Sequence, residues 1–204
     1  MNITCFKTIY YKEVLRFLKV YNQTLISPVI NSLLFLAIFM LAIGKKITVI
    51  GGISFSQFMA PGLVAMVIVQ NAFANSSSSL TMSKVLGHIT DFLIPPISAT
   101  ELILATTLAA ATRGMMVGIL AYIAIGIFVP LSIYNLSIMI LYMVLISVSL
   151  ALIGLICGLY AGSFDQMSMV TSYIITPLSF LSGTFYSVHS PVSYTHLTLP
   201  TSPK

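Results

Sequence analysis

The sequence predicts an all-α integral membrane protein, with an N-terminal interfacial amphipathic helix followed by five transmembrane helices. Of its 204 residues, 58% are hydrophobic and 6% are charged, whereas charged residues make up about a quarter of a soluble domain. The apolar residues gather in runs that approach or exceed the roughly 20 residues a helix needs to cross a bilayer. Only short polar segments separate these runs, so we expect one membrane domain.

The basic residues predict how the chain is oriented. Its formal net charge is +5, but the Lys and Arg residues lie at the edges of apolar runs and do not gather on one soluble face. This pattern is typical of membrane orientation and does not indicate a nucleic-acid partner. A cytoplasmic N-terminus leaves only Lys45 and Lys46 on the outer side. Cys5 and Cys157 have neither the spacing nor the neighbours of a disulfide or a metal site.

The first element is an amphipathic helix, which we assign to residues 1–24. Between residues 10 and 23, basic residues recur at helical spacing and apolar residues fall opposite them. The pattern predicts a helix on the membrane surface that turns its basic stripe towards anionic headgroups. Packing on a soluble partner is the alternative. The stripe comprises Lys12, Arg16 and Lys19.

The transmembrane domain is expected over residues 25–190. Ser27 and Pro28 form a helix start signal for the first span, which runs to residue 43. The second span, 58–74, ends among polar amides, which must face other helices or a cavity at that depth. These amides belong to Gln70, Asn71 and Asn75. The remaining expected spans cover 103–129, 136–159 and 167–186.

A polar strip, SKVLGHITDFLIPPISATEL, occupies residues 83–102 between the second and third spans. Its apolar residues recur at helical spacing beside charged ones, and two prolines then break the backbone. We expect a cytoplasmic helix at about 80–96 that docks on a partner protein, or, alternatively, an interfacial loop helix that needs no partner. The candidate docking residues are Lys84, Val85, Leu86, His88, Ile89, Asp91, Leu93, Pro95 and Pro96.

The last residues, 191–204, have neither the apolar length of a span nor the composition of a domain. The letters VSYTHLTLPT, at 192–201, equal the third-frame translation of a transposon-end sequencing adapter. We therefore expect this tail to be artefactual, and the natural reading frame to continue into a further span.

Catalytic chemistry is not predicted for this chain. It lacks the G-x-x-x-x-G-K-[ST] pattern of a phosphate-binding loop, so we do not expect it to hydrolyse nucleotides. Ser83, His88 and Asp91 have the spacing of a solvated helix face, and His88 has no second metal ligand beside it. We therefore expect no catalytic residue, no metal and no cofactor in the chain itself.

Four segments, in this order, resemble the membrane (permease) subunits of type-2 ATP-binding-cassette (ABC) exporters. They are FMAPGLVAMVIVQNAFANSSSS (58–79), ITDFLIPPIS (89–98), TRGMMVGIL (112–120) and SFDQMSMVTSYIITPLSFLSGTFYSV (163–188). The resemblance implies a homodimeric permease of the bacterial inner membrane, with six spans in the intact protein and a cytoplasmic N-terminus. It also implies a separate cytoplasmic ABC ATPase, which carries ATP and Mg²⁺ and docks on a coupling helix at the position of the strip.

Two other functions remain open at this point. An ion-gradient-driven secondary transporter would place carboxylates or broken helices at mid-membrane, but no Asp or Glu lies at the centre of an expected span. A membrane-embedded enzyme, the less favoured reading, would need a catalytic cluster that these residues do not form. For a permease, Gln70, Asn71 and Asn75 are candidates to line the translocation pathway, or else to bond helices together.

Overall fold

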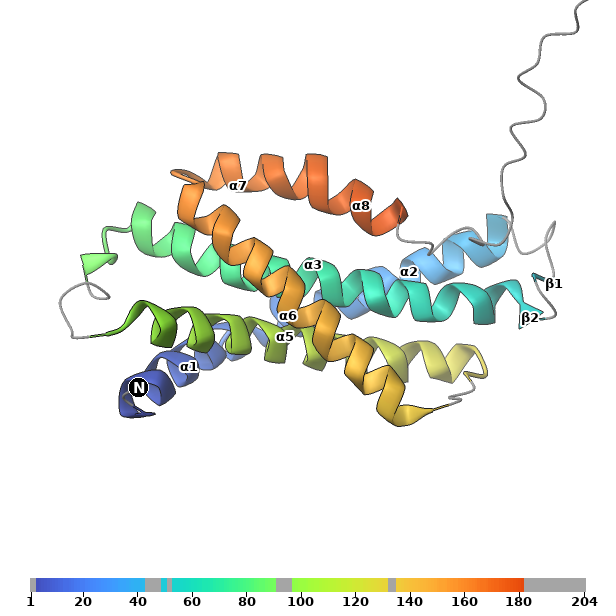
Figure 1. The fold of residues 1–204 in the computed structure, drawn as a ribbon. Coiled ribbons are helices and arrows are strands. Elements are labelled where there is room, and N and C mark those ends of the chain that lie inside the picture. Colours follow the sequence, from blue (N-terminus) through green and yellow to red (C-terminus); the bar gives the residue numbers. More distant parts are fainter. Residues whose placement is uncertain (1–2, 43–48, 51–52, 91–96, 132–134, 182–204) are drawn as a thin grey trace, which may run out of the picture.

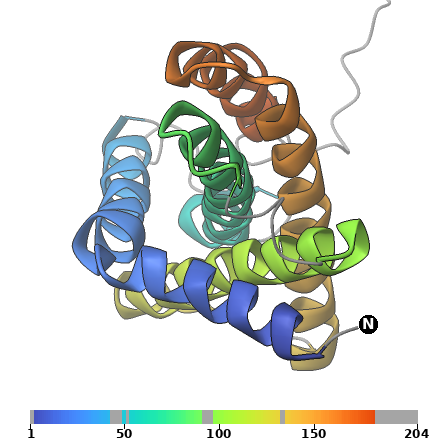
Figure 2. The same ribbon diagram turned by 90° about the vertical axis from the view of Figure 1, so that its left-hand side faces the viewer.

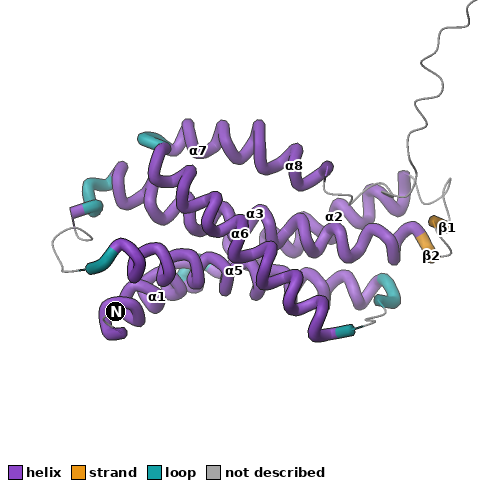
Figure 3. The backbone as a smooth tube through the Cα atoms, viewed as in Figure 1, coloured by secondary structure: helices purple, strands orange, loops and turns teal. Residues whose placement is uncertain are grey.

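The computed structural model describes residues 3–42, 49–50, 53–90, 97–131 and 135–181 (Figure 1). Apart from a hairpin whose strands have two residues each, β1 (Val49–Ile50) and β2 (Ile53–Ser54), its regular elements are helical (Figure 3). The helices are α1 (Ile3–Leu18), η1 (Asn22–Ile26), α2 (Ser27–Ala42), α3 (Phe55–Val85), α5 (Ala99–Phe128), α6 (Leu136–Tyr160), α7 (Phe164–Val170), η2 (Thr171–Ile175) and α8 (Thr176–Leu181).

Helix α1 lies within residues 1–24, where an amphipathic helix is expected, and it spans Ile3–Leu18. Ile9, Glu13 and Phe17 recur every fourth residue, and all three are buried against the bundle. The Thr24 hydroxyl donates to the Phe17 carbonyl oxygen at 2.7 Å and so joins α1 to the wide turn η1. Figure 2 shows α1 lying along α5, outside the layer that α2 and α3 form.

Helix α3 is longer than the sequence predicts, because it continues from the second span to Val85. A capping box begins it, with the Ser54 hydroxyl accepting from the Gln57 amide. Its second half is rich in hydroxyls, and the buried Ser77 and Thr81 donate to carbonyls four residues earlier. Because these side chains satisfy themselves within the helix, α3 stays regular while buried.

The prediction of one separate helix at about 80–96 is wrong over its first part. Residues 80–85 belong to α3, and a turn follows in which Gly87 has a φ of 76°. This left-handed conformation ends helices, and the Gly87 amide donates back to the Lys84 carbonyl oxygen at 3.1 Å. Asp91, Leu93, Pro95 and Pro96 lie outside the described residues.

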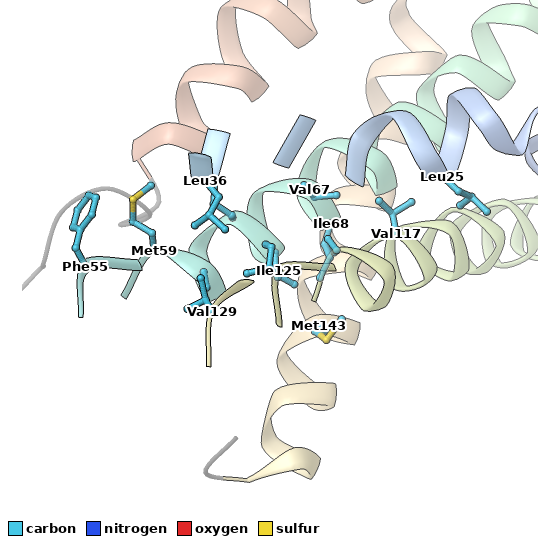
Figure 4. Packing of buried hydrophobic residues seen from close by; sticks show 14 of the residues in the cluster. Leu25, Leu36, Phe55, Met59, Val67, Ile68, Val117, Ile125, Val129 and Met143 are labelled. Atoms are coloured by element: carbon cyan, nitrogen blue, oxygen red, sulfur yellow. The ribbon is translucent and has the colours of Figure 1, made fainter. Parts of the chain in front are cut away.

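The bundle centres on α3, which packs against α6, α5 and α2. Gly114 and Gly118 of α5 and Gly154 and Gly158 of α6 face α3 and let the backbones approach closely. Towards the hairpin end, buried apolar side chains from α2, α3, α5 and α6 form the core. Figure 4 shows Ile68 of α3 and Val117 of α5 in this cluster, near Met143 of α6.

Four helices in the described part of the chain are long and apolar enough to span a membrane, namely Asn22–Ala42, Phe55–Val85, Ala99–Phe128 and Leu136–Tyr160. The predicted class, an all-α integral membrane protein, is confirmed. The fifth expected span, 167–186, appears as three consecutive helical segments from α7 to α8, and its last residues lie outside the described part. The tail at 191–204 also lies outside it.

Candidate functional site

A buried polar network joins α1 to α3. The Arg16 guanidinium donates from Nη2 to the Asn75 carbonyl oxygen at 2.9 Å and to Asn75 Oδ1 at 3.1 Å. Arg16 also forms an ion pair with Glu13, whose carboxylate oxygen lies 2.9 Å away. Glu13 is 2% exposed, so its carboxylate is shielded from water, whereas the Arg16 side chain is 29% exposed. The network fixes α1 to the centre of the bundle.

The same network reaches α5 through Arg113. Its Nη1 donates to Asn75 Oδ1 at 3.4 Å, and its Nη2 donates to Asn71 Oδ1 at 3.1 Å. Asn71 in turn donates from Nδ2 to the Val67 carbonyl oxygen at 2.9 Å. Asn71 and Asn75 are both buried. Both asparagines accept from Arg113 of α5, so they bond helices together, which is one of the two roles considered from the sequence. A role in lining a pathway stays a prediction.

The structure corrects the position of Arg16. The sequence places it on an outward basic stripe with Lys12 and Lys19, but its guanidinium turns inward to Asn75. The cause is the tertiary pairing, because Glu13 on the packing face of α1 and Asn75 on α3 both accept from it. Lys12 and Lys19 are exposed, as the stripe requires. Periodicity within α1 carries no information on an acceptor about 60 residues away along the chain.

A pocket of about 130 Å³ lies between α2 and α3. Gln70 lines it, as does Asn31 of the first span, which sequence reasoning missed. Neither side-chain amide forms a hydrogen bond within the described part of the chain. An asparagine inside an apolar run is itself the signal that could have identified Asn31. Other residues at this pocket are Ser32, Phe35, Met66 and Asn71.

The polar strip is fastened to the end of α6. Lys84 donates from Nζ to the Leu159 carbonyl oxygen and, at 3.0 Å, to the Ala161 carbonyl oxygen. A lysine in this position satisfies carbonyls that a helix C-terminus leaves unpaired. Lys84 is therefore engaged within the chain, whereas the sequence places it at the rim of a partner contact. Val85, Leu86 and His88 are exposed, and Ile89 is half-buried.

These features gather at one end of the bundle. Figure 1 shows the N-terminus of α1, the turn after α3 and the turn between α6 and α7 at the same end, with the hairpin at the other. Helix α5 begins there as well, with a capping box in which the Ser98 hydroxyl accepts from the Glu101 amide. Within the described residues, no three His, Cys, Asp or Glu side chains gather as metal ligands.

Comparison with known proteins identifies the family. The ABC-2 type transporter family matches residues 4–195. The inner membrane transport permease YadH of Escherichia coli K12 is 37% identical over 182 residues, which cover 89% of this chain and 71% of that protein. The proteins of the same name from E. coli O157:H7 and Shigella flexneri match to the same extent. No solved structure gives a significant match. The chain belongs to the ABC-2 type transporter family and is the membrane subunit of an ABC transporter.

Proposed function

We propose that the chain is the permease half of a homodimeric exporter in a bacterial inner membrane, powered by a separate cytoplasmic ABC ATPase that binds ATP and Mg²⁺. The matched relatives are named inner membrane transport permeases, which supports this assignment. The chain itself binds no nucleotide in this proposal, and its N-terminus lies in the cytoplasm. The end of the bundle that holds α1 and the strip then faces the ATPase.

One observation carries the coupling role, namely that the exposed tip of α3, where the strip begins, is joined to two spans. Val85 and Leu86 are 46% and 53% exposed at the tip of α3, which continues unbroken into the membrane. Lys84 links the same tip to the end of α6. A push on Val85 or Leu86 would therefore move α3 directly and α6 through Lys84.

Replacing Leu86 by arginine should weaken ATPase binding without lowering the amount of permease in the membrane. The side chain is exposed, so the fold tolerates the change, whereas a bulky charge in a docked contact costs about 1 to 3 kcal/mol, or roughly 5- to 150-fold in affinity. The measurement is co-purification of the ATPase, together with ATP hydrolysis by the complex. Ile53→Arg is the matched control, since Ile53 is 46% exposed at the opposite end. Equal co-purification for both variants would exclude docking at the strip.

The pocket between α2 and α3 supports a pathway on this face of the subunit. Lipid offers no hydrogen-bond partner, so the two amides of Asn31 and Gln70 need a polar cavity, a second subunit or a substrate. Gln70 is half-buried and Asn31 is exposed. We therefore place the translocation pathway along the face that carries them, at the dimer interface.

A cysteine at Gln70 should react with a charged, membrane-impermeant thiol reagent, because a water-filled pathway allows the thiolate to form. Cys5 and Cys157 are replaced first, so that the new thiol is the only one. Leu145→Cys is the control, since Leu145 is 52% exposed on α6 and is expected to face lipid. We expect Gln70→Cys to react at least about tenfold faster, with a rate that changes when the ATPase binds ATP. Equal rates at the two positions would argue against a pathway at this pocket.

A further inference from the structure

The second arginine of the polar network, Arg113, carries a positive charge that no described carboxylate balances. Glu13 is the carboxylate of the network, and it lies 2.9 Å from Arg16. Arg113 instead donates to the neutral side chains of Asn71 and Asn75, and its Nε is buried without an acceptor in the described part of the chain. Two guanidinium groups therefore share one carboxylate, and the network carries an excess positive charge inside the bundle.

This excess charge lies next to the pocket between α2 and α3. Asn71 lines that pocket, and its Oδ1 accepts from Arg113 Nη2 at 3.1 Å. A single residue therefore lies between the guanidinium and the pocket. Protein and lipid screen a buried charge far less than water does, so its potential extends beyond its direct contacts. We expect the pocket to be electropositive, although the guanidinium does not line it.

The lining of the pocket offers nothing to offset this potential, because none of the described residues in it is acidic or basic. Its unpaired polar groups are the amides of Asn31 and Gln70, which have no partner among the described residues. Both amides can donate to the oxygens of an anion. Phe35 and Leu63 belong to an apolar wall. An anionic head with an apolar body matches the two parts of the lining, whereas a cation would meet the charge of Arg113 with no carboxylate to hold it.

We propose that Arg113 gives the translocation pathway a preference for anionic amphiphiles over cationic ones. This role rests on the proposed function, because it requires the substrate to pass the pocket beside Gln70. Arg113 acts by its charge, across Asn71, and does not touch the substrate. Asn71 is held between Arg113 and the Val67 carbonyl oxygen, which leaves the anionic head to the amides of Asn31 and Gln70.

The test compares two methanethiosulfonate reagents, one with an anionic sulfonate and one with a cationic trimethylammonium group. They react with Gln70→Cys in the permease purified with its ATPase, after Cys5 and Cys157 have been replaced. Each rate is divided by the rate of the same reagent with 2-mercaptoethanol. The ratio of the two normalised rates does not depend on the thiolate fraction, which both reagents share. We expect this ratio to favour the anionic reagent at least about fivefold.

Arg113→Gln should bring the ratio close to one, because glutamine can still donate to Asn71 but carries no charge. Arg113→Lys keeps the charge and should keep most of the preference. Lys7→Gln is the matched control, since it removes an exposed positive charge outside the pocket. It should leave the ratio unchanged.

A pair of amphiphiles tests the substrate class without any change at Arg113. Decanoate and decyltrimethylammonium have the same apolar chain and heads of opposite charge. Decanoate should slow the reaction of Gln70→Cys with the neutral reagent N-ethylmaleimide more strongly than decyltrimethylammonium does. Equal protection by the two amphiphiles would overturn the proposal even if Arg113→Gln failed to fold.

The outcomes separate this proposal from the pathway on which it rests. Reaction of Gln70→Cys with both charged reagents, without a normalised preference, would overturn the role of Arg113 and leave the pathway in place. Reaction with neither reagent would overturn the pathway, and the role of Arg113 with it. A preference that persists in Arg113→Gln would assign the selectivity to another group and would also overturn the proposal.

Discussion

Gly154→Ala is expected to destabilise the protein more than the addition of one methyl group usually does. A Cβ atom at this position would lie 2.5 Å from the Phe73 carbonyl oxygen and 3.1 Å from Phe73 Cα, and against Ser76 Oγ. Two of these neighbours are α3 backbone atoms, which cannot rotate aside as a side chain does. Helix α6 must therefore move away from α3, and the free energy of unfolding should fall by about 1 to 3 kcal/mol.

The measurement is unfolding in mixed micelles as the fraction of a denaturing detergent rises, followed by circular dichroism. Gly126→Ala is the matched control, because its new Cβ atom would meet only Leu131 Cδ1, at 3.8 Å. This control should be neutral or stabilising, since alanine favours a helix over glycine by roughly 1 kcal/mol. Identical midpoints for the two variants would mean that α3 and α6 do not pack as closely as described.

Asn75→Leu should produce the second large effect, because it removes the amide that two arginines share. Arg16 loses both its Oδ1 contact at 3.1 Å and the polar surroundings of that contact, and Arg113 loses its contact at 3.4 Å. Arg16 still donates to Glu13, and Arg113 still donates to Asn71. Leaving buried charge partly unpaired costs about 3 kcal/mol, and the same unfolding measurement should show this loss.

Gln70→Leu is the control for Asn75→Leu, since it makes the same kind of change on α3 without removing a hydrogen bond within the described residues. It should leave the midpoint close to that of the unchanged protein. Adding Arg113→Leu to Asn75→Leu should restore part of the stability, because the second change removes one of the unpaired charges. If the double variant lost the sum of the two single effects, the two residues would not be coupled.

The sequence alone was sufficient for the membrane class and for most of the spans. Lipid offers no partner to the backbone, so a long apolar run must form a helix that satisfies its own hydrogen bonds. Residues 103–129 and 136–159 accordingly appear as α5 and α6 with boundaries only slightly shifted. The resemblance carried by the second span and the later segments was confirmed by the family match.

The positions of the polar side chains were decided by the tertiary structure. Helical periodicity shows which residues of α1 share a face, but the inward turn of Arg16 depends on Asn75, and the capping of α6 by Lys84 depends on the approach of α3. The sequence ends the second span at residue 74, yet α3 continues as helix because hydroxyls such as those of Ser77 and Thr81 bond within it and glycines of α6 pack against it. Each span must satisfy its own backbone hydrogen bonds in lipid, so its hydrophobic pattern can be read from the local sequence. A buried polar group is placed by the group that pairs with it, and that partner lies elsewhere in the chain.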